Sequence, residues 1–298
     1  MQGIRAGVTF RSGRQAVGLV IFAVLVLLAA GGCGRRERTV MPVTIDERIG
    51  SAAPRHPQDF SSHEAVVRGV AAILRRDFSL PVPEHVTVYL YASRALFERG
   101  LVDDGLLAPV RAAELGEFAV AVGQRRQLLL HNEGAPPSSR YWLKLIAHEL
   151  THVAQIELAG REGQAEQWLT EGMAEWVAFT VLERVGLDTV QHRRRVAASG
   201  IRNHAALVAA RLDLETLGSP RGFTVRHLKE GSLPTYQLAF LMADYLIDRD
   251  GLGGVIDYFR AFSKSQNRHV NFERAFKQSI DQFEQEILTH LKMVVQSR

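Results

Sequence analysis

The chain has a single cysteine, Cys33, among its 298 residues, so no disulfide can form within it. It contains no internal repeat and no low-complexity tract. The apolar run at residues 16–30 is shorter than the roughly 20 residues that a membrane-spanning helix needs. These absences leave a region of ordinary globular composition, long enough for one large core or for two lobes.

The first 33 residues are typical of an export signal. A positively charged start precedes the apolar run, and it is formed by Arg5, Arg11 and Arg14. The run has the length of a signal-peptide core and ends in small residues directly before Cys33. That ending resembles the lipobox of bacterial lipoproteins, with Ala30 where leucine is usual. The resemblance implies that residues 1–32 are a signal peptide and that lipid is attached to the Cys33 sulfur.

This interpretation places the mature protein at the bacterial cell envelope, with Cys33 as its membrane anchor. We expect residues 33–60 to form a flexible tether, because they hold arginine, proline and polar residues without apolar periodicity. Gly34 differs from the aspartate that commonly retains lipoproteins at the inner membrane, which favours the periplasmic face of the outer membrane. The alternative is an ordinary or uncleaved signal in which the cysteine is incidental.

The formal net charge of the chain is +4, but much of it lies in the signal. Removal of residues 1–32 takes away three arginines and no acids, so the charge falls from +4 to +1. The high isoelectric point is therefore no reason to expect nucleic acid as a partner. The run Arg193-Arg194-Arg195 is expected to be a solvated helix face.

Hydrophobic periodicity predicts an α+β domain over residues 61–298, with a small mixed α/β lobe (61–160) before a mainly helical lobe (161–298). The expected strands are Val86–Tyr91, Glu117–Val122 and Gln127–His131, the last two joined around Gly123. The expected helices cover residues 62–77, 93–100, about 139–158 and 165–185, and later helices break near Gly200, Gly218, Gly231 and Gly251.

The first strong sign of function is the pentapeptide His148-Glu149-Leu150-Thr151-His152, which reads H-E-x-x-H. Residues four apart stack on one face of a helix, so the two histidines can aim their imidazoles at one metal ion. Glu149 lies between them, displaced around the helix axis, and can reach a water on that metal without being a ligand. The pattern therefore predicts a metal site with its own general base.

A catalytic zinc site usually has three protein ligands, so two histidines do not complete one. The next apolar helix contains Trp168-Leu-Thr-Glu171-Gly-Met-Ala-Glu175-Trp176. Glu171 follows His152 by 19 residues, which allows one helix to end and a second to pass the metal. Glu171 is therefore the candidate third ligand. The aromatic residues nearby are expected to pack in the core: Tyr141, Trp142, Trp168 and Trp176.

These two segments resemble the gluzincin metallopeptidases, in particular the aminopeptidase-N family and the small bacterial "peptidase MA-like" proteins. The resemblance covers about residues 139–250. It implies a zincin-like fold, one zinc ion per chain and Glu171 as the third zinc ligand. It also implies that Glu175, one turn further on, supports the metal or a ligand histidine.

One departure from the aminopeptidases bears on specificity. Their Gly-x-Met-Glu-Asn segment, which holds the amine of the substrate, has no counterpart, and the nearest text at residues 113–117 does not match. Exopeptidase specificity therefore does not carry over, and we expect an endopeptidase that acts on peptide or protein in extended form. An exposed edge strand at Glu117–Val122 could pair with such a substrate, and proline at Phe118 or Val120 would then weaken its binding.

Tyr236 is the candidate second catalytic residue, beside Glu149. It lies just inside a predicted helix start, as does the catalytic tyrosine of the aminopeptidase-N family, which implies that it stabilises the oxyanion. The other interpretation is an ordinary half-buried tyrosine. His131 and His227 are weaker donor candidates, and we expect both to be surface or loop histidines.

The sequence leaves several functions open. The leading prediction is a zinc metallo-endopeptidase in which Glu149 activates a water for attack on a peptide carbonyl. A zinc-lined cleft used only for docking or envelope assembly, an esterase, and a lipoprotein with a relic site are the alternatives. Zinc binding alone does not need Glu149, so its presence favours catalysis.

Overall fold

The computed structural model describes residues 38–45, 54–161, 165–204 and 212–296. The chain divides into two compact units, Met1–Gly34 and Arg35–Arg298. The first unit lies outside the described residues, as does Cys33, so the signal peptide and the lipid anchor stay predictions. Within the described part of the second unit, no helix has the length and apolar character needed to cross a membrane.

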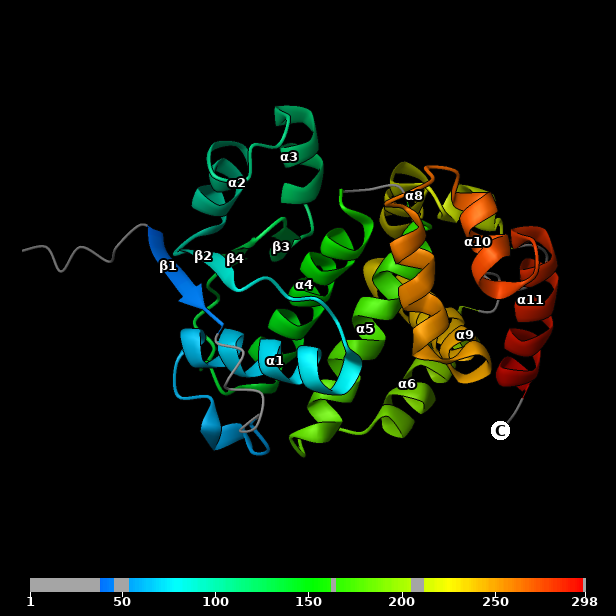
Figure 1. Cartoon of the computed structure of the whole chain (residues 1–298), viewed down its shortest axis with the longest axis horizontal. Helices are drawn as coiled ribbons and strands as arrows, with labels where there is room; N and C mark the ends of the chain where they lie inside the picture. The colour runs from blue at the N-terminus through cyan, green and yellow to red at the C-terminus, as the bar shows by residue number, and fades with distance from the viewer. Residues whose placement is uncertain (1–37, 46–53, 162–164, 205–211, 297–298) are drawn as a thin grey trace, which may run out of the picture. The chain divides into compact units, whose positions relative to one another are not determined.

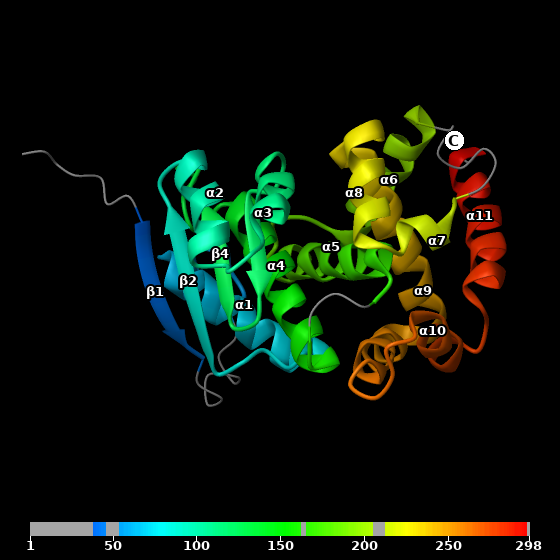
Figure 2. The same ribbon diagram turned by 90° about the horizontal axis from the view of Figure 1, so that it is seen from above.

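The second unit has the predicted α+β architecture, with a four-stranded sheet followed by a mainly helical region (Figures 1 and 2). The strands are β1 (Arg38–Thr44), β2 (His85–Tyr91), β3 (Ala121–Gln124) and β4 (Gln127–His131), in the order β1-β2-β4-β3. The β2–β4 pair is parallel and the two outer pairs are antiparallel. Strand β3 is therefore an edge strand.

Alternating side chains of the sheet enter two different cores. Val86, Val88 and Leu90 of β2 belong to the main core, which is shared with α1 (His63–Phe78) and α4 (Arg140–Ala159). Tyr89 and Tyr91 point to a smaller core with α2 (Arg94–Asp103) and α3 (Pro109–Gly116). Figure 1 shows α2 and α3 on one side of the sheet and α1 on the other.

The remaining helices make up the second half of the unit. They are α5 (Gln167–Arg184), α6 (Val190–Asn203), α7 (Leu214–Leu217), α8 (Pro220–Glu230), α9 (Ser232–Ala261), α10 (Arg268–Phe276) and α11 (Ile280–Gln296). Helix α5 packs against both α4 and α9. A Cβ at Gly172 would lie 2.2 Å from the carbonyl oxygen of Ala239, so this glycine permits the close approach of α5 to α9. The aromatic residues Trp142 and Trp168 are fully buried, as predicted.

The prediction of a flexible tether over residues 33–60 is wrong for residues 38–44. These residues form β1 and pair along their whole length with β2, from Arg38 opposite Tyr91 to Thr44 opposite His85. Most of the β1 side chains are at least partly exposed, so the strand lacks the apolar alternation that would have revealed it. Pro42 fits this position because an edge strand does not need every backbone N–H for pairing.

The predicted strand at Glu117–Val122 is also displaced. Helix α3 ends at Gly116, and the strand begins only at Ala121, so Phe118 and Val120 lie in the connection between them. Gly123 lies inside β3, and the turn to β4 falls at Arg125 and Arg126 instead. The connection, residues 117–120, contains half-buried apolar side chains, and their spacing resembles that of a strand.

The predicted helix breaks are confirmed at three of the four glycines. Gly218 and Gly231 separate helices α7, α8 and α9, and Gly251, with φ 77° and ψ 157°, kinks α9. The break predicted near Gly200 is displaced by three residues, because Gly200 lies within α6 and the helix ends at Asn203. Helix α4 is capped at its start, where the Ser139 side chain accepts a hydrogen bond from the backbone N–H of Trp142.

Candidate metal centre

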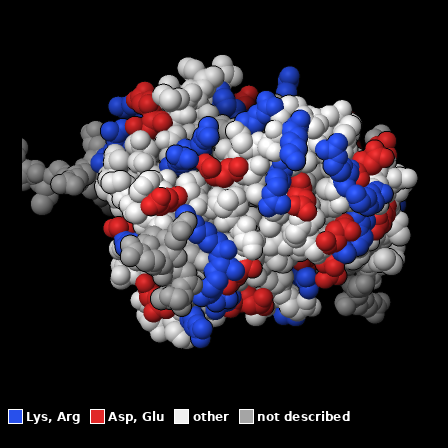
Figure 3. Space-filling model, viewed as in Figure 1, with Lys and Arg blue, Asp and Glu red and all other residues white. Residues whose placement is uncertain are grey.

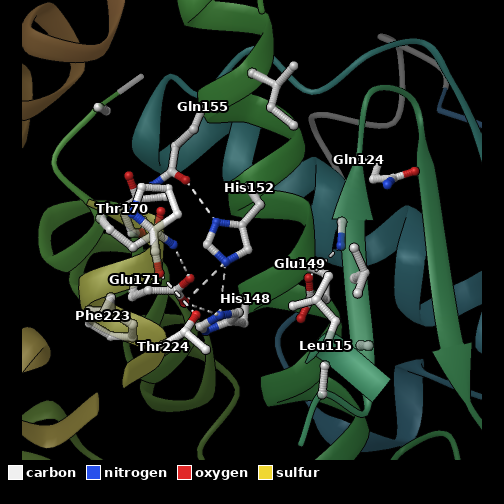
Figure 4. A pocket seen from close by; sticks show the side chains of 18 of the residues that line it. Leu115, Gln124, His148, Glu149, His152, Gln155, Thr170, Glu171, Phe223 and Thr224 are labelled. Carbon is white, nitrogen blue, oxygen red and sulfur yellow. Dashed lines mark hydrogen bonds and ion pairs between the residues drawn. The ribbon is translucent and has the colours of Figure 1, made fainter. Parts of the chain in front are cut away.

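Three side chains from α4 and α5 converge at one point, as the sequence predicted. The Nε2 atoms of His148 and His152 are 3.0 Å apart. The Oε2 atom of Glu171 lies 3.3 Å from the first and 3.5 Å from the second. Figure 4 shows the three groups facing one another within the cleft. This largely buried group could hold a metal ion.

The hydrogen bonds around His152 determine which of its ring nitrogens is available to a metal. The backbone carbonyl of Thr170 can only accept, so the Gln155 side chain donates to it through Nε2, at 3.0 Å. The Gln155 Oε1 atom therefore faces the Nδ1 atom of His152 at 2.9 Å and accepts its hydrogen. This arrangement leaves the Nε2 atom of His152 as a lone-pair donor for a metal.

The other nitrogen of His148 lies at ion-pair distance from Glu175. The Oε1 atom of Glu175 lies 3.1 Å from the Nδ1 atom of His148, so the proton of this imidazole belongs on Nδ1. Glu175 is itself held by Lys144, whose Nζ atom is 2.6 Å from the same oxygen. Glu175 thus lies where the sequence placed it. Lys144 was missed, because nothing in the sequence connects it to a residue 31 positions later.

The electrostatics of the cluster favour positive charge between the three groups. Burial opposes a charge on His148, but Glu171 and Glu175 outweigh it and raise the pKa of this imidazole to about 10. The pKa of His152 is raised for the same reason, against its burial, chiefly by Glu171. Burial also opposes ionisation of the two carboxyls, yet His152 and His148 lower the pKa of Glu171, and Lys144 and His148 lower that of Glu175 to about 2.

Glu149 lies beside the cluster and is not part of it. Its Oε2 atom accepts a hydrogen bond of 2.6 Å from the backbone N–H of Gly123, in edge strand β3. A Cβ on Gly123 would lie 2.4 Å from the Glu149 carbonyl oxygen, so only glycine lets β3 approach α4 this closely. The sequence predicted a turn at Gly123 and gave no sign of this contact. Glu149 is buried, and Figure 4 shows it between His148 and the strand.

Tyr236 also lies at the cleft, in the first turns of α9. Its ring centroid is 6.2 Å from that of His148. Burial, followed by the nearby carboxylates, of which Glu171 is the strongest, raises the pKa of the Tyr236 hydroxyl well above its ordinary value. The hydroxyl therefore keeps its proton at neutral pH and can donate a hydrogen bond.

His227 is not the surface histidine that was predicted. It is buried on α8, and its ring centroid lies 5.8 Å from that of Tyr236 and 4.3 Å from that of Phe118. Burial lowers the pKa of His227, with Glu171 acting in the opposite sense, and its Nδ1 atom has no hydrogen-bond partner within the described structure. His131, in contrast, lies at the end of β4, 3.8 Å from Glu133, and is not among the cleft residues.

Two cavities meet at this cluster. One, of about 290 Å³, extends past His152 and is lined by β3, α3 and α8. The other, of about 450 Å³, extends from His148 toward the start of α4 and is lined by α5, α6 and α9. Both are bordered by the same residues at their junction: His148, Glu149, His227 and Tyr236. The candidate metal centre therefore lies in a cleft that passes it on both sides.

Comparisons of the chain with protein-family models, with curated proteins and with solved structures find no match. Similarity therefore assigns the chain to no family. The resemblance to gluzincins rests on the motif residues alone.

Replacement of Glu175 tests the arrangement of the metal centre without any substrate. We expect Glu175→Gln to weaken the affinity for a divalent metal by about 10–100-fold, because His148 loses its charged acceptor. Competition against a chromophoric chelator measures this. Glu183→Gln, at an exposed position on the same helix, is the matched control and should bind metal normally. Equal affinity of both variants would remove Glu175 from the site.

Proposed function

We propose that this chain is a zinc-dependent hydrolase, and specifically a metallo-endopeptidase. One observation supports this above the others: three lone pairs converge in a cleft while a fourth group, Glu149, lies beside them with its own hydrogen bond to the edge strand. A site that only binds metal needs the three converging groups. A site that hydrolyses a substrate also needs a base that is not a ligand.

The ligand set and its spacing fit zinc. Two imidazoles and one carboxylate are a usual catalytic zinc set, with a fourth position left for water or substrate. Tetrahedral bonds of 2.0–2.1 Å would separate the ligand atoms by roughly 3.3 Å. The observed separations of 3.0, 3.3 and 3.5 Å bracket that value. Oxygen-preferring ions such as Mg²⁺ are a poorer match to a site with two imidazoles.

Zinc bound at this point would lower the pKa of a water toward about 7 and polarise the carbonyl of the substrate. In this proposal Glu149 would take the proton from a water as the water attacks the substrate carbonyl. The Gly123 N–H holds one carboxylate oxygen and leaves the other for proton transfer. The same carboxyl can then deliver the proton to the departing amine.

Stabilisation of the oxyanion needs a further donor, and Tyr236 is the candidate for it. Tyr236 has a protonated hydroxyl, and its ring lies near the rings of His148 and His227. A donor aimed at the developing negative charge is worth more in the transition state than in the ground state. We assign this role to Tyr236, with His227 as its neighbour on the cleft wall.

Edge strand β3 is the proposed docking site for an extended substrate. The Gly123 N–H points away from β4, toward Glu149, so the backbone groups of Ala121, two residues earlier, face the same way. Ala121 also lines both cavities. Backbone pairing would begin at Ala121, and the positions expected earlier, Phe118 and Val120, lie outside the strand.

The alternative functions differ from this proposal in what they require. A docking or assembly lipoprotein, or one with a relic site, has no use for the contact between Gly123 and Glu149. An esterase would use the same groups, so only substrate tests separate it from a peptidase. Attachment to the cell envelope through Cys33 belongs to the proposal as well, with membrane lipid as one partner and extended peptide or protein as the other.

Replacement of Glu149 separates catalysis from metal binding. We expect Glu149→Gln to keep its zinc but to cleave a quenched peptide library several orders of magnitude more slowly, since the base is lost. Zinc content and initial rates are measured on the same preparation. Glu157→Gln, on the same helix but outside the cleft lining, should match the parent. Undiminished hydrolysis by Glu149→Gln would end the proposal.

Removal of the Tyr236 hydroxyl tests the oxyanion role. Tyr236→Phe should lower kcat by roughly 100-fold with little change in KM, because the hydrogen bond forms in the transition state. Tyr245→Phe is a fitting control, because that hydroxyl lies on the same helix but bonds to Glu286 at 2.6 Å. A normal kcat in Tyr236→Phe would assign the residue to packing.

A further inference from the structure

The cavity that extends from His148 toward the start of α4 has an unusual charge composition. Three basic side chains line it: Arg140, Lys144 and Arg193, here called the basic arm. The acidic residues that line it, within the described structure, are Glu149 and Glu175, and both belong to the proposed catalytic centre. Beyond the catalytic centre, the charges of this cavity are therefore all positive.

Two residues of the basic arm, Arg140 and Lys144, lie along helix α4. Lys144 and Arg140 precede His148 by four and eight residues, which places them on successive turns. At 1.5 Å per residue, they lie about 6 and 12 Å from His148 along the helix axis. An extended peptide covers about 3.3–3.6 Å per residue. A substrate held at the metal would therefore pass the arm about two to four residues from the bond that is cleaved.

The charges of the arm are only partly balanced inside the protein. Arg140 and Arg193 share one carboxylate, Asp188, which lies 2.5 Å from the Nη2 atom of Arg140 and 2.5 Å from the Nε atom of Arg193. Among the described residues, two guanidinium groups on one carboxylate leave one positive charge and several N–H donors without an acceptor. Lys144 is paired with Glu175 and adds no excess charge.

An apolar wall holds two of these cations in place. The ring of Phe179 on α5 lies under both, with Lys144 Nζ at 5.4 Å and Arg193 Cζ at 5.3 Å from its centroid. Val196 and Leu233 add apolar lining to the same cavity. A group with a short aliphatic stem and an anionic end matches this combination of apolar wall and unbalanced positive charge.

The uniformly positive charge beyond the catalytic centre is a local property of this cavity. On the face of the molecule seen in Figure 3, basic and acidic side chains are interspersed. The chain without residues 1–32 carries a net charge of only +1. The positive charge of the basic arm is therefore a local arrangement, of a kind that selects ligands by charge.

We propose that the basic arm binds a carboxylate of the substrate, two to four residues from the scissile bond, so that the enzyme prefers acidic peptides. This inference rests on the proposed peptidase function. The carboxylate can come from an aspartate or glutamate side chain or from the C-terminus of the substrate. The arm also repels lysine and arginine at the same positions.

A series of matched peptides tests this proposal. Quenched peptides of one neutral sequence carry glutamate, glutamine or lysine at each of four positions on either side of the cleavage site, all with amidated C-termini. We expect the glutamate peptides to exceed the glutamine peptides by roughly 10–100-fold in kcat/KM, on one side only and two to four residues away. Lysine should be the poorest. A glutamine peptide with a free C-terminus separates the two sources of carboxylate.

Two variants test whether the basic arm causes the preference for glutamate peptides. Arg193→Gln and Arg140→Gln should each reduce the ratio of glutamate to glutamine rates toward one. Arg140 is half exposed, so its replacement keeps the test valid even if Arg193→Gln fails to fold. Arg260→Gln, which removes one charge from an exposed position on α9, is the control and should keep the preference.

The outcomes separate this proposal from the proposed function. Equal rates for glutamate, glutamine and lysine at every position would overturn the basic arm, as would a preference that survives both arginine replacements. If no peptide is cleaved, the peptidase proposal fails. In that case, fluorescence anisotropy of the same peptides on Glu149→Gln still tests the arm, which requires tighter binding of the glutamate peptides.

Discussion

The site depends on one electrostatic constraint, the convergence of three lone pairs from two packed helices. Each histidine has its Nδ1 atom beside an acceptor, Glu175 or Gln155, so in the neutral tautomer the Nε2 lone pairs of both imidazoles face Glu171. Such an arrangement is repulsive unless a cation lies at its centre. The raised pKa values of both imidazoles report the same demand for positive charge.

The fold supplies what this centre needs from both sides. Helix α5 brings Glu171 and Glu175 to α4, and its close approach to α9 brings Tyr236 to the same cleft. On the opposite wall, β3 fixes Glu149 through a backbone N–H. The cleft then continues past the centre along α4. Ligands, base, donor and substrate path thus come from different elements, and their mutual positions depend on helix packing.

The sequence predicts those features of the site that the local geometry of a helix determines. His148 and His152 share a helix face, so their convergence follows from the helix itself, and Glu171 followed from a resemblance carried by nearby residues. Lys144 and the contact of Gly123 were missed because each depends on a residue distant in sequence. His227 was named as a weaker donor candidate, but its burial was not predicted. Strand β1 was missed for a related reason: it depends on pairing with β2, and its own residues show no apolar alternation.

Metal analysis of the purified protein tests the central claim most directly. After zinc loading and exhaustive dialysis, inductively coupled plasma mass spectrometry should find about one zinc per chain, and none in Glu171→Ala with both histidines intact. Anomalous scattering from a crystal should place that zinc between the Nε2 atoms of His148 and His152 and the Glu171 carboxylate. A protein that retains no metal after loading, or binds it elsewhere, would contradict the account.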